Sequence, residues 1–222
     1  MSAVIYAIGD IHGEKVMLDE MHRRILADAE NRPGDKLAVY LGDYIDRGPD
    51  SAGVVATLMD SPLPFPTICL LGNHEDMCLG SDRYLWLYNG GDKTEASYGG
   101  YVKDSHKAWM RGLPLSHRAG KWLFVHAGID PYRGLALQDR ETLLWMRQPF
   151  LTYRGKMPEG VTVVHGHTPR KSPNILHNRI GLDTGACYGG ALSCGVLTNN
   201  LDRIIRVTAE ETYWVKHREG VL

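Results

Sequence analysis

The sequence has no long hydrophobic run, little net charge and few cysteines, and each of these absences excludes a class of protein. No apolar stretch approaches the roughly 20 residues that cross a bilayer, and no signal peptide is apparent, because Met1-Ser2 leads straight into a short apolar run. The formal net charge is -1, so no basic field favours nucleic acid or an anionic membrane. We therefore expect neither partner, and any phosphate chemistry must depend on local charge.

The four cysteines form no CxxC pair, and two of them lie in apolar runs of strand length. We interpret them as reduced, mostly buried thiols and expect a cytoplasmic protein. The 222 residues, 43% hydrophobic and 23% charged, are typical of one soluble domain covering residues 1–222. Low-complexity tracts are lacking as well.

One pattern occurs five times: a short apolar run of strand length ends at an Asp, Asn or His beside glycine. The runs are 4–8, 37–41, 67–71, 122–125 and 161–164, and they lead into Gly9-Asp10-Ile11-His12-Gly13, Gly42-Asp43-Tyr44-Ile45-Asp46-Arg47-Gly48, Gly72-Asn73-His74-Glu75, His126-Ala127-Gly128 and His165-Gly166-His167-Thr168. Helical spacing of apolar residues predicts helices from Lys15 to about Ala29 and from Ser51 to about Asp60.

This pattern has a physical reason. Neighbouring strand ends in a sheet lie about 5 Å apart, so short side chains just past those ends can converge, and open α/β sheets bind ligands at that edge. A single Asp or His there is more often a cap or a buried polar group, but five such ends predict a metal-centred site.

Charge indicates how many metals this site would hold. Asp10 and Asp43 supply two negative charges, whereas Asn73 and the histidines are neutral ligands, so one divalent ion would be almost completely offset. Two divalent ions would leave a net charge of about +2, which attracts a phosphate dianion, and such a pair can activate a water for in-line displacement. Two metals therefore fit better than one.

Taken together, the five motifs between positions 9 and 168 resemble the signature of the phosphoprotein phosphatase (metallophosphoesterase) superfamily, most closely its small bacterial and phage serine/threonine phosphatases. The resemblance implies an α/β fold with a central β-sandwich of two mixed sheets flanked by helices, the calcineurin-like metallophosphoesterase fold. The metals would lie at the C-terminal strand ends.

The resemblance also implies two ligand sets that share Asp43. The first metal would be held by Asp10, His12 and Asp43, and the second by Asp43, Asn73, His126 and His167. The last motif contains two histidines, and the family's ligand is the one after glycine, so His167 is our ligand and His165 is interpreted as a supporting or core histidine.

His74 follows a ligand and would act as the general acid, because an alkoxide leaving group needs a proton as the P–O bond breaks. Asp46 would accept a hydrogen bond from its imidazole and keep it protonated near neutral pH. Arg47 would bind the phosphate oxygens through its forked guanidinium.

A second phosphate-binding arginine is expected between His126 and His167. Arg147 is our candidate because Trp145 precedes it by two places, as in the small phosphatases that the chain resembles, although Trp145 could equally be core. Arg133, Arg140 and Arg154 are the competing positions.

Residues from about 80 to 118 are predicted to form a helical, aromatic insertion, either with its own aromatic core or as a lip that stacks a base or packs a peptide. Asn89-Gly90-Gly91 interrupts its run of aromatic residues. Further downstream, strands within 179–185, 192–197, 204–207 and 212–215 are predicted to form the second sheet as a meander.

The sequence thus predicts a metal-dependent phosphatase that hydrolyses phosphoserine and phosphothreonine in a phosphoprotein or phosphopeptide. A hydroxide bridging the two divalent metals would attack phosphorus directly, with manganese favoured and iron or zinc as alternatives. The main alternative is a symmetrical dinucleoside tetraphosphate hydrolase, because 182–190 resembles those enzymes too. A catalytically silent metal-binding module is the second alternative, but it would have no use for an acid such as His74.

Overall fold

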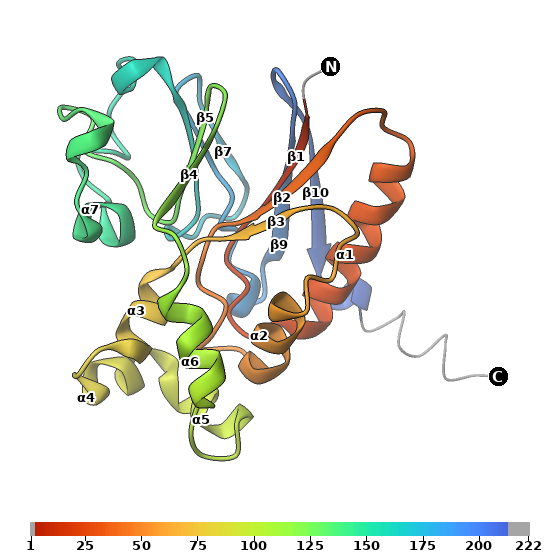
Figure 1. Cartoon of the computed structure of the whole chain (residues 1–222), viewed down its shortest axis with the longest axis vertical. Helices are drawn as coiled ribbons and strands as arrows, with labels where there is room; N and C mark the ends of the chain where they lie inside the picture. Colours follow the sequence, from red (N-terminus) through yellow and green to blue (C-terminus); the bar gives the residue numbers. More distant parts are fainter. Residues whose placement is uncertain (1–2, 213–222) are drawn as a thin grey trace.

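The computed structural model of the protein describes residues 3–212 as two five-stranded sheets with helices on their outer sides (Figure 1). The first sheet has the order β10-β9-β1-β2-β3 and contains β1 (Val4–Ile8), β2 (Lys36–Tyr40), β3 (Thr67–Cys69), β9 (Ala191–Leu197) and β10 (Leu201–Thr208). The second has the order β4-β5-β6-β8-β7 and contains β4 (Ser116–Ala119), β5 (Trp122–Val125), β6 (Thr162–His165), β7 (Asn174–Ile175) and β8 (Arg179–Gly181).

Both sheets are mixed. β1, β2 and β3 are parallel, whereas β9 pairs antiparallel with both β1 and β10. β5, β6 and β8 are parallel, whereas β4 and β7 pair antiparallel with their neighbours. The predicted class, two mixed sheets flanked by helices, is therefore confirmed.

The helices lie outside this sandwich and at one end of it. They are α1 (Lys15–Glu30), α2 (Ser51–Met59), α3 (Asn73–Leu79), α4 (Arg83–Trp86), α5 (Asp92–Ser97), α6 (Asp104–Arg111) and α7 (Arg140–Trp145), with a π-helical turn η1 (Leu87–Gly91) and three short 3-10 turns, η2 (Leu135–Leu137), η3 (Pro158–Gly160) and η4 (Ala186–Tyr188). In Figure 1, α1 lies along the first sheet, α7 beside the second, and α3 to α6 gather at one end. The two helices predicted from periodicity are α1 and α2.

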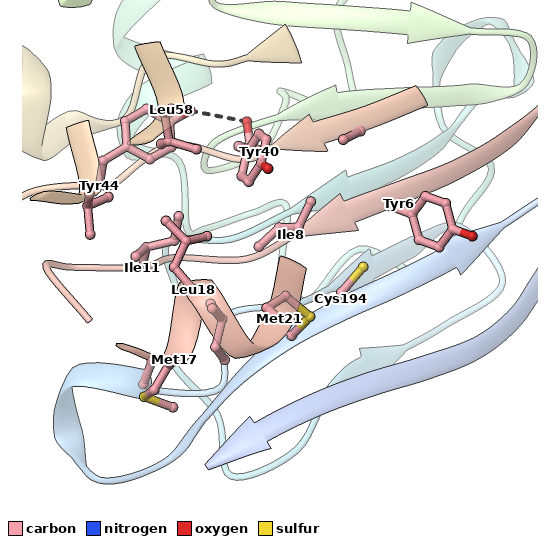
Figure 2. Packing of buried hydrophobic residues seen from close by; sticks show 14 of the residues in the cluster. Tyr6, Ile8, Ile11, Met17, Leu18, Met21, Tyr40, Tyr44, Leu58 and Cys194 are labelled. Atoms are coloured by element: carbon pink, nitrogen blue, oxygen red, sulfur yellow. Dashed lines mark hydrogen bonds between the residues drawn. The ribbon is translucent and has the colours of Figure 1, made fainter. Parts of the chain in front are cut away.

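Apolar side chains that point alternately to the two faces of the first sheet form a core on each face. In β1, Ile5 and Ala7 pack between the sheets with Phe124 and Val164 of the second sheet. The alternate residues of β1 face the helices, where Tyr6 and Ile8 pack with apolar residues of α1 at helical spacing, among them Met17, Leu18 and Met21 (Figure 2). The strands are thereby fixed from both sides, which holds their C-terminal ends in place.

The predicted composition of the second sheet is wrong. Of the proposed meander only β8 belongs to that sheet, whereas β9 and β10 extend the first sheet by antiparallel pairing with β1. Thr212 lies in a helical turn at 209–212 instead of a strand, and 213–215 lie outside the described residues. Alternation identifies strands but does not specify which distant strand each one pairs with.

The segment from 80 to 118 contains α4, η1, α5 and α6 and ends in β4. Its buried side chains, among them Trp86, Val102 and Met110, join the cluster formed by the first sheet with α1 and α2. Tyr84, Tyr88 and Tyr101 are exposed. A separate aromatic core is therefore not what orders this segment.

Two smaller expectations concern the thiols and the membrane. Cys69, Cys78, Cys187 and Cys194 are all free, and Cys78 and Cys194 are buried. Within residues 3–212, none of the helices combines the length and the apolar character that crossing a membrane requires.

Candidate metal centre

The five ligand-type motifs meet where the two sheets adjoin. They follow β1, β2 and β3 of the first sheet and β5 and β6 of the second. Backbone bonds join them: His12 N–H donates to the carbonyl of Asp43 at 2.8 Å, and Gly166 N–H to that of His126 at 2.8 Å. Between the sheets, His126 Nδ1 donates to the carbonyl of Leu41 at 2.8 Å. The motifs therefore meet in one place, with ligand-type side chains drawn from both sheets.

The backbone of this site is strained. Seven non-glycine residues in the described part of the chain have positive φ, and five of them belong to the site: His12 (45°), Asp43 (53°), Asp46 (72°), Arg47 (68°) and His167 (64°). Each such conformation costs about 1–3 kcal/mol and persists only where the surroundings impose it. Strain of this kind is typical of residues whose side chains must be aimed at a common point.

Asp43 lies between two compact groups of metal-ligand side chains. His12, Asp43 and His74 form one group and Asp43, His126 and His167 the other, with the ligand atoms of each group within 4.8 Å of one another. Asp43 Oδ2 is 3.4 Å from His12 Nε2, whereas Asp43 Oδ1 is 3.4 Å from His126 Nε2. The two carboxylate oxygens thus face opposite histidines, as a bridging ligand requires.

The histidines are held in the neutral form that binds metal. His12 Nδ1 donates to the carbonyl of Ile45 at 2.8 Å, which leaves Nε2 facing Asp43. Burial lowers the pKa of His12 to about 3 and that of His167 to about 2, and it also lowers the pKa of His126. Each is therefore uncharged at neutral pH, with a lone pair available.

The lone pairs of His126 Nε2 and Asn73 Oδ1 face each other with no proton between them. Asn73 Oδ1 is 2.7 Å from His126 Nε2 and 2.9 Å from His167 Nδ1, although His126 has its proton on Nδ1 toward Leu41. Among the described residues, Asp10 Oδ1 and His167 Nε2 are buried without a hydrogen-bond partner. Nitrogen and oxygen donors arranged in this way fit divalent transition ions.

Asp10 completes the charge of the site but belongs to neither compact group. Its Oδ2 accepts from His167 N–H at 2.9 Å. Burial, and then the carboxylates of Asp183 and Asp43, raise the pKa of Asp10 well above its usual range. Burial by itself would also raise the pKa of Asp43, but the adjacent His126, His74 and His12 hold it below the usual range. Such a cluster of buried carboxylates requires compensating cations.

The predicted acid pair is present beside this cluster. His74 Nδ1 is 2.6 Å from Asp46 Oδ2, and both side chains are buried. The ring of His74 lies edge-on to that of His12, with 4.7 Å between centroids. Because Nδ1 is engaged by Asp46, Nε2 is the nitrogen of His74 that is left outside this pair.

The two predicted phosphate-binding arginines flank the site. Arg47 Nη1 is 2.6 Å from His12 Nε2, and its guanidinium lies 5.4 Å from the ring centroid of Tyr188. Arg147 is exposed, and its charge contributes to the lowered pKa of both His126 and His167.

The competing arginines are engaged elsewhere. Arg140 pairs with Asp76 at 2.6 Å, Arg133 lies 3.4 Å from Asp130, and Arg154 donates to the carbonyl of Leu151. Trp145 is partly exposed and lies edge-on to His167 at 6.1 Å, so it belongs to the rim of the site more than to the core.

His165 lies away from these groups. Its ring lies edge-on to Phe150 with centroids 5.0 Å apart, and burial lowers its pKa to about 4. These surroundings are compatible with either expected role, a core histidine or one that supports the neighbouring His126 and His167.

Glu75 is a site residue to which sequence reasoning assigned no role. It is fully buried; its Oε2 accepts from the N–H groups of Asp43 (2.9 Å) and Gly72 (3.0 Å), and its Oε1 from those of Tyr44 (2.8 Å) and Ile45 (3.2 Å). Burial and the Asp43 charge raise the pKa of Glu75 to about 8, which the backbone donors oppose. In the sequence, the feature that could have identified Glu75 as a site residue is its position directly after His74 in the third motif.

Asp183 was also missed, although it follows the same pattern. It comes directly after β8 and a leucine, and a glycine stands two residues later, as in the motifs that were recognised. Burial raises the pKa of Asp183 to about 6, and its charge acts on Asp10.

A fold of two mixed sheets with a buried carboxylate and histidine cluster at the strand ends defines a metal-dependent phosphoesterase. The family model for the calcineurin-like phosphoesterases matches residues 3–206, and the chain belongs to that family.

Three similar proteins differ in what they are named for. A serine/threonine-protein phosphatase 1 of Salmonella typhimurium is 32% identical, covering 85% of this chain and 89% of that protein. An asymmetrical bis(5'-nucleosyl)-tetraphosphatase of Halalkalibacterium halodurans is 26% identical, covering 84% and 87%. The crystal structure of a suspected diadenosine tetraphosphatase superposes with a TM-score of 0.72 at 26% identity, covering 94% of each chain. These similarities agree on the family and differ on the substrate.

Proposed function

We propose that the protein is a dinuclear-metal phosphatase of phosphoserine and phosphothreonine residues. The observation that carries this proposal is the buried His74–Asp46 pair, with 2.6 Å between Nδ1 and Oδ2, beside the carboxylate and histidine cluster. A serine or threonine alkoxide leaves poorly without a proton, and general acid catalysis contributes about 10²–10⁴ in rate. The similarity to a serine/threonine phosphatase over most of both chains supports the same substrate class.

Two divalent ions would be held by Asp10, His12 and Asp43 on one side and by Asp43, Asn73, His126 and His167 on the other, where they would activate water and offset phosphate charge. Mixed nitrogen and oxygen donors suit manganese, with iron or zinc as alternatives. Asp43 joins the two sets, because its oxygens face His12 and His126 separately.

The remaining residues act on the substrate. Arg47 and Arg147 would hold the phosphate oxygens from either side of the cluster, since a guanidinium can form two parallel hydrogen bonds to such a group. His74 would donate its Nε2 proton to the leaving oxygen, while Asp46 holds Nδ1. We place this activity in the cytoplasm, where free thiols such as those of Cys78 and Cys194 persist.

A second function, hydrolysis of dinucleoside tetraphosphates, is favoured by a pocket beside Tyr188. The pocket measures about 410 Å³ and is lined by Arg170, Lys171 and Tyr188 together with glycines of the 184–190 segment. Because Tyr188 also lies against Arg47, a base and further phosphates could extend from the metal centre into this pocket. Two of the three similar proteins named above carry that activity in their names.

A direct rate comparison tests the proposal. The manganese-loaded protein is assayed on a phosphoserine peptide and on diadenosine tetraphosphate, with Asp43→Asn as the inactive control. We expect kcat/KM to be at least about tenfold higher for the phosphopeptide, a difference of about 1.4 kcal/mol in transition-state binding. The reverse order would favour the second function, and no turnover of either substrate would indicate a silent metal-binding module.

A further inference from the structure

The carboxylate of Asp46 accepts hydrogen bonds on both of its oxygens from the segment Trp86 to Thr94. Trp86 Nε1 donates to both oxygens at 3.0 Å, and Thr94 Oγ1 donates to Oδ1 at 2.7 Å. Together with His74 Nδ1 on Oδ2 at 2.6 Å, these bonds occupy both oxygens of a fully buried group. The carboxylate therefore has no freedom to turn about its own axis without breaking a hydrogen bond.

Thr94 also fixes the backbone at the same residue. The N–H of Asp46 donates to Thr94 Oγ1 at 2.8 Å and to Ser51 Oγ at 3.1 Å. Asp46 has a φ of 72°, which a non-glycine residue keeps only when its neighbours impose it. Thr94 thus holds both the main chain and the carboxylate of one residue.

The two glycines of the segment have a structural reason in this arrangement. A Cβ on Gly91 would lie 2.5 Å from the Trp86 ring, so only glycine allows the indole to pack there. Gly90 has a φ of 103°; its carbonyl accepts from Arg47 N–H at 3.2 Å, and a Cβ on it would lie 2.9 Å from Arg47 Cγ. The π-helical turn is therefore shaped to place Trp86 against Asp46 and its own backbone against Arg47.

We propose that Trp86 and Thr94 are positioning residues of the acid: they fix Asp46, and through it the direction in which His74 presents Nε2 to the leaving oxygen. The inference rests on the proposed function, because it assigns a role within that reaction. This role is additional to the two interpretations of the aromatic insertion, because neither of them assigned Trp86 a contact with Asp46.

The electrostatics agree with this geometry. Burial raises the pKa of Asp46, and the hydrogen bonds from His74, Thr94 and Trp86 oppose that rise. Two neutral donors on the carboxylate favour its charged form, which is the form that accepts a hydrogen bond from His74 Nδ1. Removal of either donor would loosen this buried carboxylate, although each of its oxygens would keep one hydrogen-bond partner.

The test uses leaving groups that differ in their need for a proton. Thr94→Val removes one donor with little change of shape, and Thr94→Ser keeps the hydroxyl. Trp86→Phe removes the other donor but also shortens a buried ring system. The manganese-loaded proteins are assayed on a phosphoserine peptide and on p-nitrophenyl phosphate, whose aryl leaving group needs no acid. We expect both donor-less variants to lose at least about tenfold in kcat on the peptide and less than about threefold on the aryl ester, with Thr94→Ser close to wild type.

The control variant is Ser97→Ala. Ser97 lies at the end of α5, three residues after Thr94, and its Oγ accepts from Ala52 N–H of α2 at 2.8 Å; it forms no hydrogen bond with Asp46 but a longer one with Asp50. We expect both of its rates to remain within about twofold of wild type. Bound manganese per chain and the circular dichroism spectrum show whether each variant is folded; if Trp86→Phe is not, Thr94→Val carries the test alone.

A double variant separates this inference from the proposed function. His74→Asn should lose far more on the peptide than on the aryl ester, and addition of Thr94→Val should cost nothing more, since Thr94 acts through His74. Equal losses of Thr94→Val on both substrates, or full additivity with His74→Asn, would overturn the positioning role alone. Equal losses of His74→Asn on both substrates would overturn the acid, and both proposals with it.

Discussion

Asp43 is the residue at which the two halves of the candidate site meet. Its oxygens lie 3.4 Å from His12 Nε2 and 3.4 Å from His126 Nε2, and its N–H is held by Glu75. An asparagine has the same shape, but it lacks the charge and has one oxygen in place of two. The bridge should therefore be more sensitive to this substitution than any ligand of one metal.

We expect Asp43→Asn to reduce bound metal from two ions per chain to one or fewer, measured by elemental analysis after dialysis against manganese. Activity should fall by more than about 100-fold, because even residues that merely support metal ligands cost about 10–100-fold when removed. Asp60→Asn, the same change at an exposed residue after α2, is the control and should keep both ions. Two ions retained by Asp43→Asn would contradict the bridge.

Arg47 differs from an ordinary surface arginine in its strained backbone and in its contacts with His12 and Tyr188. Lysine keeps the charge but cannot fork onto two phosphate oxygens. We expect Arg47→Lys to raise KM for the phosphopeptide by about tenfold or more, since a charged hydrogen bond contributes about 1.5–3 kcal/mol. Arg83→Lys, an exposed arginine paired with Glu95, is the comparison, and an unchanged KM for Arg47→Lys would place phosphate binding elsewhere.

For single residues, the sequence indicates the side chains that belong to a motif. It does not indicate the side chains that form hydrogen bonds with them from distant positions. Asp43 and His74 were evident because glycine and a strand end marked them. Trp86 and Thr94 were not, since an aromatic residue at helical spacing and a threonine look like core and surface, and their contact with Asp46 spans 40 and 48 positions. Hydrogen bonds of that sequence separation leave no local pattern to read.

Among the elements, α1 was the simplest to predict, and one of its polar contacts with the sheet, made by His22, is buried. His22 Nε2 is 2.7 Å from the hydroxyl of Tyr40 on β2, in a buried position. Burial lowers the pKa of His22 to about 4; Asp19 opposes this shift and Lys15 adds to it. In the unfolded chain a histidine titrates near about 6.5.

The folded protein should therefore lose stability as the pH falls below about 6.5, because the unfolded chain binds a proton at His22 that the folded chain refuses until about pH 4. This contribution amounts to at most about 1.4 kcal/mol per pH unit. We expect His22→Gln to flatten the decline of the unfolding free energy between pH 6.5 and 4 by that amount, measured by urea titration in chelator. Above pH 8 the two curves should run parallel, and an identical slope in both proteins below pH 6.5 would show that His22 takes up its proton in the folded state.

The insertion shows what an element can do besides packing. The sequence of α4, η1 and α5 is typical of a small helical unit, but these elements also form hydrogen bonds with Asp46 and Arg47. The helices are present as expected, but their contacts with Asp46 and Arg47 were not expected, because helical periodicity indicates which residues are buried and not what they contact.

In the whole molecule, the candidate centre joins the two sheets. Asp10, Asp43 and Asn73 follow strands of the first sheet, and His126 and His167 follow strands of the second. The sequence predicted that these side chains would meet, because each follows a strand of recognisable length. It did not predict that they come from different sheets, because the length and pattern of a strand do not identify the strand with which it pairs. The antiparallel pairing of β9 with β1, for example, joins residues about 190 positions apart.

This arrangement makes stability and metal binding oppose each other at Asp10. Without metal, its carboxylate is buried near those of Asp43 and Asp183, with Oδ1 lacking a partner among the described residues. Asn at this position removes one like charge, so in chelator Asp10→Asn should melt at the same temperature as wild type or higher, by about 2–4 °C for each kcal/mol of repulsion removed.

With metal the order should reverse. Free manganese at 100 times its Kd stabilises the folded state by about 2.7 kcal/mol, or about 5–11 °C in a domain of this size, and Asp10→Asn should gain much less because a charged ligand is gone. Melting both proteins with manganese and with chelator measures the four values, and Asp60→Asn, which leaves the cluster intact, should follow wild type in both. If Asp10→Asn gained as much from manganese as wild type, Asp10 would not be a ligand. If Asp10→Asn melted lower than wild type in chelator, the carboxylates of Asp10, Asp43 and Asp183 would not destabilise the metal-free protein by repulsion.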